Sequence, residues 1–159
     1  MKTIRLLLMI SLFYLALSNI HAQQTTYYQS VDQEIQTAKE LFRKNNFVSA
    51  LELFGQIEDR TDEDSELHSE ACFYKALCSV KMDNDNAESL IAGFTGRYPA
   101  SPYKNQAWFE LGANQFEHKK YAAVLRSFRE VNAASLPPDE RAKLHYQKGY
   151  SHFAMEKYD

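Results

Sequence analysis

Cys72 and His68 are the first residues whose types and spacing suggest chemistry. They stand four positions apart, which on a helix places a thiol beside an imidazole. Such a pair can generate a nucleophilic thiolate, so a repeat domain attached to a thiol hydrolase is one alternative function. A hydrolase also needs donors for an oxyanion, and no glycine-rich loop after a strand supplies them here. We therefore interpret the pair as packing residues and predict no catalytic residue.

Two other groups of side chains could bind a metal ion. Histidine and carboxylate groups share one predicted helix at His145, His152 and Glu156, but their spacing is not a known zinc signature. Three acidic residues could hold calcium, namely Asp59, Asp62 and Asp64, but no glycine-centred loop closed by a glutamate surrounds them. We predict packing histidines, a solvated acidic linker, and neither a metal nor a cofactor. A metal hydrolase remains an alternative.

The chain has two cysteines, Cys72 and Cys78. Six helical positions separate them by about 240° around the axis, so they cannot easily bond to each other. We predict that both are small buried apolar residues. An intermolecular disulfide is the alternative, and it would require an oxidising compartment.

The first 22 residues resemble a secretory signal peptide. Lys2 and Arg5 precede an apolar run over residues 6–17, and Ala22 is a small residue suited to cleavage before Gln23. The run is too short to span a bilayer as a mature helix, and an uncleaved anchor is the alternative. Because no cysteine follows the cleavage point, we expect no lipid tether. The predicted location is the periplasm or the periplasmic side of the outer membrane.

Charge narrows the class of partner. The 159 residues carry a net charge of −3, and the mature chain carries −5, because residues 1–22 hold two of the 18 basic residues and none of the 21 acidic ones. An acidic surface disfavours nucleic acid and anionic membranes as partners. No later segment is apolar enough to cross a membrane, so we expect no integral membrane segment after cleavage.

A 37-residue period organises the rest of the chain. Phe47, Asn84, Tyr121 and Tyr158 mark it. Positions that are equivalent in successive repeats hold residues of similar size. Three residues after the first three markers stand Ala50, Ala87 and Val124, and large apolar residues follow at Phe54, Ile91 and Phe128 and at Ile57, Phe94 and Val131. Upstream, Ala38, Gly112 and Gly149 keep the period and Ala76 falls one residue off it. Such equivalent positions indicate stacked helical hairpins and no sheet.

Two motifs carry a family resemblance. The segment 108–112 contains Trp, two residues, Leu and Gly, and Ala50 with Phe54 forms an Ala-three-Phe element. The chain is thus similar to tetratricopeptide repeat (TPR) proteins. Its Tyr-Pro link at 98–103 resembles that of Gram-negative envelope members: the Tol–Pal periplasmic partner, the TPR lipoprotein of outer-membrane assembly, and long multi-repeat proteins. The resemblance implies an all-α solenoid of about three and a half repeats.

The expected domain plan follows from this period. Residues 1–22 are the signal peptide, 23–30 a lead-in, and 31–159 the repeat domain, divided as 31–63, 64–99, 100–136 and a partial repeat 137–159. Predicted helices cover 31–44, 47–58, 65–82, 84–97, 102–119, 121–131 and 139–157. Since the fourth repeat lacks a second helix, we expect an N-terminal fragment of a longer array, or self-association through the uncapped half-repeat.

In TPR proteins the first helices of successive repeats line a concave groove. By helical position, the groove should contain Ile35, Lys39, Phe42, Arg43, Cys72, Ala76, Val80, Gln106, Phe109, Ala113, Phe116, Tyr146, Tyr150 and Phe153. Aromatic groups favour peptide or helix recognition, and core packing is the alternative for the same residues. We predict a non-catalytic scaffold that binds a protein partner. The alternatives are a solenoid piece without separate activity and the hydrolase above.

Overall fold

The computed structural model describes residues 31–156. The predicted signal peptide, the lead-in and residues 157–159 lie outside the described residues. Seven α-helices form the described part: residues 31–43, α2 (Phe47–Arg60), α3 (Glu66–Lys81), α4 (Ala87–Arg97), α5 (Lys104–Glu117), α6 (Tyr121–Arg129) and α7 (Pro138–Glu156). A short 3₁₀ helix, η1 (Ala133–Ser135), precedes α7. The prediction of an all-helical domain is confirmed.

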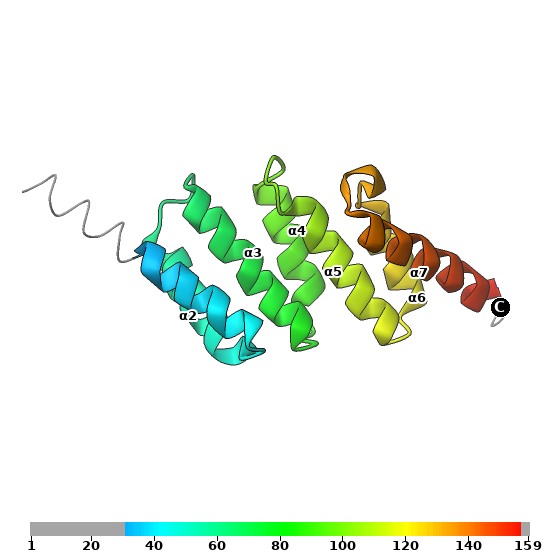
Figure 1. Cartoon of the computed structure of the whole chain (residues 1–159), viewed down its shortest axis with the longest axis horizontal. Coiled ribbons are helices and arrows are strands. Elements are labelled where there is room, and N and C mark those ends of the chain that lie inside the picture. Colours follow the sequence, from blue (N-terminus) through cyan, green and yellow to red (C-terminus); the bar gives the residue numbers. More distant parts are fainter. Residues whose placement is uncertain (1–30, 157–159) are drawn as a thin grey trace, which may run out of the picture.

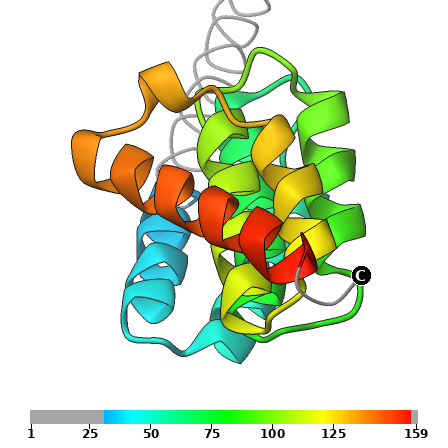
Figure 2. The same ribbon diagram turned by 90° about the vertical axis from the view of Figure 1, so that its right-hand side faces the viewer.

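The helices follow one another in chain order along the long axis of the domain (Figure 1). Each packs mainly on its neighbours in sequence, and α5 also contacts α3 and α7. Figure 2 looks onto the C-terminal end, where α7 lies across α5 and α6. Among the described residues, no helix is long and apolar enough to cross a membrane.

Three left-handed turns join helices into antiparallel pairs. Asn45, Asp83 and Lys119 have φ values of 59°, 54° and 58°. At each turn, the N–H of the left-handed residue and the N–H of the next residue donate to carbonyls in the preceding helix, as in Lys119 N to Phe116 O (2.9 Å) and Lys120 N to Gln115 O (2.9 Å). This is the Schellman arrangement that ends helices. The same turn therefore closes three successive hairpins.

The core divides into clusters between successive helices. Small residues let the first two helices approach, since Ala38 and Ala50 are both fully buried. The middle cluster joins α3, α4 and α5 around Phe73, which stacks on Tyr103 with ring centroids 4.5 Å apart. The third cluster joins α5, α6 and α7 through Phe109 and Phe128. Burial of these apolar groups is the main source of stability.

Several predicted helix boundaries differ from the structure by one to three residues. The helix expected from residue 84 begins at Ala87, because residues 83–86 form the turn. The helix expected from residue 102 begins at Lys104, because Ser101 accepts hydrogen bonds from the backbone N–H of Tyr103 and of Lys104. The helix expected to reach residue 131 ends at Arg129, where the chain turns toward η1.

Candidate functional site

The C-terminal helix presents a row of exposed aromatic side chains. Tyr146, Tyr150 and Phe153 are 65%, 42% and 58% exposed, and they follow one stripe of α7 at helical spacing. Phe116 of α5 and Tyr121 at the start of α6 adjoin them, since the ring of Tyr150 lies 5.6 Å from that of Phe116 and 5.8 Å from that of Tyr121. These five residues are called the C-terminal aromatic patch below. The patch combines α7 with both helices of the preceding hairpin, α5 and α6.

Besides Ala76, four other residues of the predicted groove are buried. Ile35 is 1% exposed, Val80 0%, Phe109 3% and Ala113 5%. Phe109 stacks on Phe128 inside the third core cluster, with ring centroids 6.1 Å apart. These side chains form the seams between helices, so they offer no surface to a partner. For them the core-packing interpretation fits the structure.

The N-terminal part of the predicted groove is polar and internally paired. Lys39 Nζ lies 2.7 Å from Glu70 Oε1, and Tyr103 Oη donates to the same carboxylate oxygen at 3.0 Å. Burial, followed by this hydrogen bond with Glu70, raises the pKa of Tyr103 to about 12. Phe42 packs edge-on against Phe47 and Tyr74, whereas Arg43 and Gln106 are exposed.

The structure places Cys72 and Ala76 on a different face of α3 from Glu70. Glu70 faces Lys39, and two positions further along a helix is a rotation of about 200°, so Cys72 points to the opposite side of α3. Both residues line a different pocket with side chains of α2 and α4. The physical reason is the one-residue offset of Ala76 from the repeat period, which rotates the faces of α3 by about 100°.

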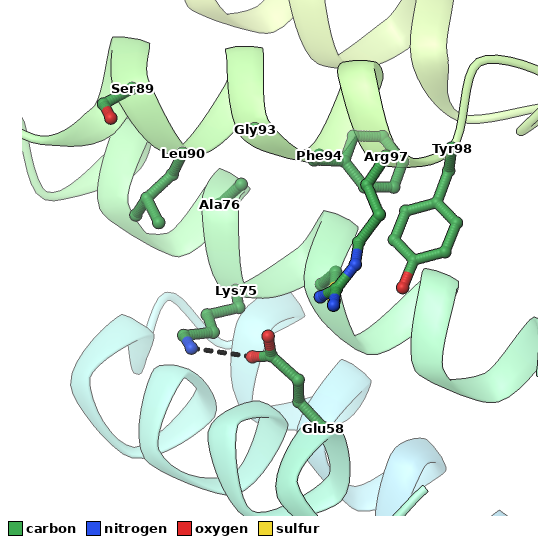
Figure 3. A pocket seen from close by; sticks show the side chains of 10 residues that line it. Glu58, Lys75, Ala76, Ser89, Leu90, Gly93, Phe94, Arg97 and Tyr98 are labelled. Atoms are coloured by element: carbon green, nitrogen blue, oxygen red, sulfur yellow. Dashed lines mark hydrogen bonds and ion pairs between the residues drawn. The ribbon is translucent and has the colours of Figure 1, made fainter. Parts of the chain in front are cut away.

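That pocket lies between α2, α3 and α4 and has a volume of about 400 Å³ (Figure 3). Leu90 and Phe94 of α4 form its apolar wall. Lys75 Nζ donates to Glu58 Oε2 at 2.7 Å on the opposite wall. Arg97 and Tyr98 extend from the end of α4 toward this pair, and Arg97 also pairs with Glu63 at 2.8 Å.

Electrostatics in the pocket keep the thiol protonated. Burial raises the pKa of Cys72 to about 12, and the Glu58 carboxylate adds to the shift through its charge and a hydrogen bond. Burial also works to raise the pKa of Glu58, but the hydrogen bond and positive charge of Lys75 outweigh it, so the pKa of Glu58 is lowered. Burial alone raises the pKa of Cys78 to about 12. The arrangement therefore opposes a nucleophilic role for either thiol.

We expect both cysteines to react slowly with iodoacetamide in the folded, chelator-treated chain. At pH 8, a thiol with a pKa of about 12 has a thiolate fraction roughly a thousandfold smaller than that of an ordinary thiol with a pKa of about 9. Mass spectrometry of timed samples measures the rates, and the urea-unfolded chain is the control. Labelling of Cys72 as fast in the folded as in the unfolded chain would support the hydrolase alternative instead.

The two cysteines are free thiols and are not joined to each other, as the helical spacing predicts. The structure leaves His145, His152 and Glu156 exposed on α7, and Asp59, Asp62 and Asp64 exposed between α2 and α3. It does bring together a set of donors that the sequence analysis missed, because Glu58 of α2 joins His68 and Cys72 of α3. The four-residue spacing of His68 and Cys72 was the available signal. Nothing in the sequence points to Glu58.

No family model, curated protein or solved structure gives a significant match to this chain. Its class therefore follows from the coordinates: an all-helical domain in which seven stacked helices pack mostly on their sequential neighbours.

Proposed function

We propose that this chain is a TPR-like repeat protein. Three equivalent Schellman turns, at Asn45, Asp83 and Lys119, support the proposal, because recurrence of one irregular backbone feature favours repetition of a hairpin unit. The contacts of α3 with α5 and of α5 with α7 also support it. In this arrangement the first helix of each hairpin packs on the first helix of the next, as a solenoid requires.

We further propose that its function is to bind a protein partner without catalysis. The observation that carries this proposal is the C-terminal aromatic patch. Three of the four exposed large hydrophobic side chains in residues 31–156 lie together on α7, and Val48 of α2 is the fourth. A group of exposed aromatics is typical of interaction sites, because large rigid rings bury much area at little cost in conformational entropy.

The proposed occupant is a protein segment that inserts apolar side chains among these rings. Aromatic rings provide most of the contact area, and the hydroxyl groups of Tyr146 and Tyr150 can hydrogen-bond the polar edge of such a segment. The proposed location is the periplasm or the inner side of the outer membrane. That location rests on the signal-like pattern of residues 1–22.

A photo-crosslinking experiment tests the binding proposal. A photoreactive amino acid replaces Tyr150 in one variant and Val48 in a control variant, because Val48 is 70% exposed but lies away from the patch. Both full-length chains are produced in a Gram-negative host, irradiated, and fractionated. We expect one specific crosslinked protein from the Tyr150 variant, recovered in the periplasmic fraction, and none from the control.

Affinity measurements then establish the contribution of the patch. With the purified partner, Tyr146→Ala combined with Tyr150→Ala should weaken binding by about 30-fold or more, as expected for central aromatic contacts. Val48→Ala should leave the dissociation constant unchanged. Equal crosslinking at both positions would argue against the proposal. If the crosslinks join only two copies of this chain, the patch mediates self-association and does not bind a different protein.

A further inference from the structure

Three side chains that can bind metals meet beside the pocket between α2 and α3. Glu58 comes from the last turn of α2, and His68 and Cys72 are one turn apart on α3. One carboxylate oxygen, one imidazole nitrogen and the sulfur all lie within 4.8 Å of one another. Ligands spaced at i and i+4 on a helix present their donor atoms to one point, a spacing that zinc sites use.

His68 is oriented as a ligand would be. Its Nδ1 lies 3.1 Å from Thr61 O and 3.2 Å from Thr61 Oγ1. Since Thr61 O can only accept, Nδ1 carries the proton and donates to it. A ring that carries its single proton on Nδ1 presents a lone pair at Nε2, as in metal-binding histidines whose other nitrogen is held by a backbone carbonyl.

The Nε2 atom of His68 is itself unsatisfied. The side chain is 4% exposed, and Nε2 is buried with no hydrogen-bond partner among the described residues. A buried acceptor without a partner costs free energy. One of the two ring nitrogens of His68 lies within 4.8 Å of a carboxylate oxygen of Glu58 and of the sulfur of Cys72. The orphaned nitrogen is therefore a second observation, independent of the proximity of the three residues, that points to a ligand.

The three donors select a particular class of ion. Imidazole nitrogen and thiolate sulfur favour zinc and similar transition metals, whereas calcium and magnesium prefer sets made only of oxygen. Bond lengths near 2.0–2.3 Å place the donors of a tetrahedral zinc site roughly 3.5 Å apart. The three donor atoms now lie within 4.8 Å of one another. Rotation of the Glu58 and Cys72 side chains toward His68 would bring them to the spacing of a zinc site.

We propose that Glu58, His68 and Cys72 bind one divalent ion of the zinc class and thereby join α2 to α3. Binding releases the proton of the Cys72 thiol to solvent, so the thiolate and the carboxylate together balance the charge of the ion. The neighbouring pocket leaves room for a fourth ligand, such as water. Lys75, which already pairs with Glu58, competes with the ion for the carboxylate.

Metal titration tests the site. The full-length chain is purified, reduced and treated with a chelator, and is then titrated with Co²⁺ and with Zn²⁺. We expect one ion per chain and, with Co²⁺, the near-ultraviolet charge-transfer absorption that indicates a thiolate ligand. Cys72→Ser should abolish this absorption, and Glu58→Gln and His68→Gln should each weaken binding at least tenfold. Cys78→Ser is the matched control, because Cys78 is the buried cysteine outside the group, and it should bind like the parent.

A further variant keeps the test informative if a ligand substitution disturbs folding. Lys75→Met removes the competing ammonium group without removing a ligand, so it should lower the dissociation constant at least threefold. Helical circular dichroism checks that each variant is folded. Absence of stoichiometric binding, unchanged absorption in Cys72→Ser, or an unchanged or higher dissociation constant in Lys75→Met would overturn the proposal. Loss of the ion on His145→Ala would place it on α7 and would equally overturn it.

Discussion

Replacing Phe73 with alanine is expected to lower the free energy of unfolding by about 3–5 kcal/mol, as for other buried aromatic residues. Phe73 is 1% exposed, stacks on Tyr103 at 4.5 Å, and packs against Phe94 at 5.7 Å. Its ring therefore holds α3 to α4 and to the start of α5. Removing it leaves a cavity at the junction of two hairpins, in the middle of the stack.

Thermal and urea unfolding, followed by helical circular dichroism, measure this loss. For a domain of this size we expect the midpoint temperature to fall by roughly 10–20 °C. Val48→Ala is the control, because Val48 is 70% exposed, and it should change stability by less than about 0.5 kcal/mol. A loss below about 1 kcal/mol for Phe73→Ala would contradict the packing described for the middle cluster.

Replacing Gly112 with alanine is expected to destabilise the domain by about 1–2 kcal/mol, although alanine is the better helix former. A Cβ atom at this position would lie 2.5 Å from Phe128 Cδ1 and closer still to Cε1. Phe128 is 2% exposed and packs on Phe109, so its ring cannot move away freely. The missing side chain of Gly112 is what allows α5 and α6 to approach.

Gly149 is the matched control, because it stands one 37-residue period after Gly112. A Cβ atom at Gly149 meets nothing within 4 Å. Gly149→Ala should therefore stabilise the chain by about 0.5–1 kcal/mol through helix propensity alone. Replacing the opposing ring with a smaller side chain, by adding Phe128→Leu to Gly112→Ala, should restore part of the stability that Gly112→Ala loses. Equal effects of the two glycine substitutions would contradict the close contact between α5 and α6.

The helices were predictable from sequence because their signals are local. Apolar spacing placed every helix of the described part within a few residues of its observed position. The short helix η1 was not predicted, because three residues carry no periodic signal. The later start of α5 depends on hydrogen bonds to Ser101, which a sequence pattern does not specify.

The chain departs at α3 from the constant period that was used to place the residues of the predicted groove. The left-handed residues Asn45, Asp83 and Lys119 are 38 and then 36 positions apart, and the same one-residue offset appears at Ala76. An offset of one residue turns a helix face by about 100°. Because of this offset, Cys72 points away from Lys39. The aromatic residues of α7 lie on an exposed face.

The group of Glu58, His68 and Cys72 shows what sequence reasoning could not reach. His68 and Cys72 share a face because they share a helix, which is a local property. Glu58 belongs to α2 and joins them only because α2 and α3 pack together. The unsatisfied state of His68 Nε2 likewise depends on the burial of one atom, and only coordinates reveal it.

The stacking of each helix on its near neighbours in the chain has a mechanical consequence. The first helix (residues 31–43) and α7 lie at opposite ends of the described part (Figure 1), so tension applied to the two ends acts on each helix–helix interface in turn. The weakest seam should part first while the others hold, since each hairpin keeps its own closing turn. Stretching a single molecule should therefore lengthen it in several steps, and the Phe73 seam should be among the last to yield.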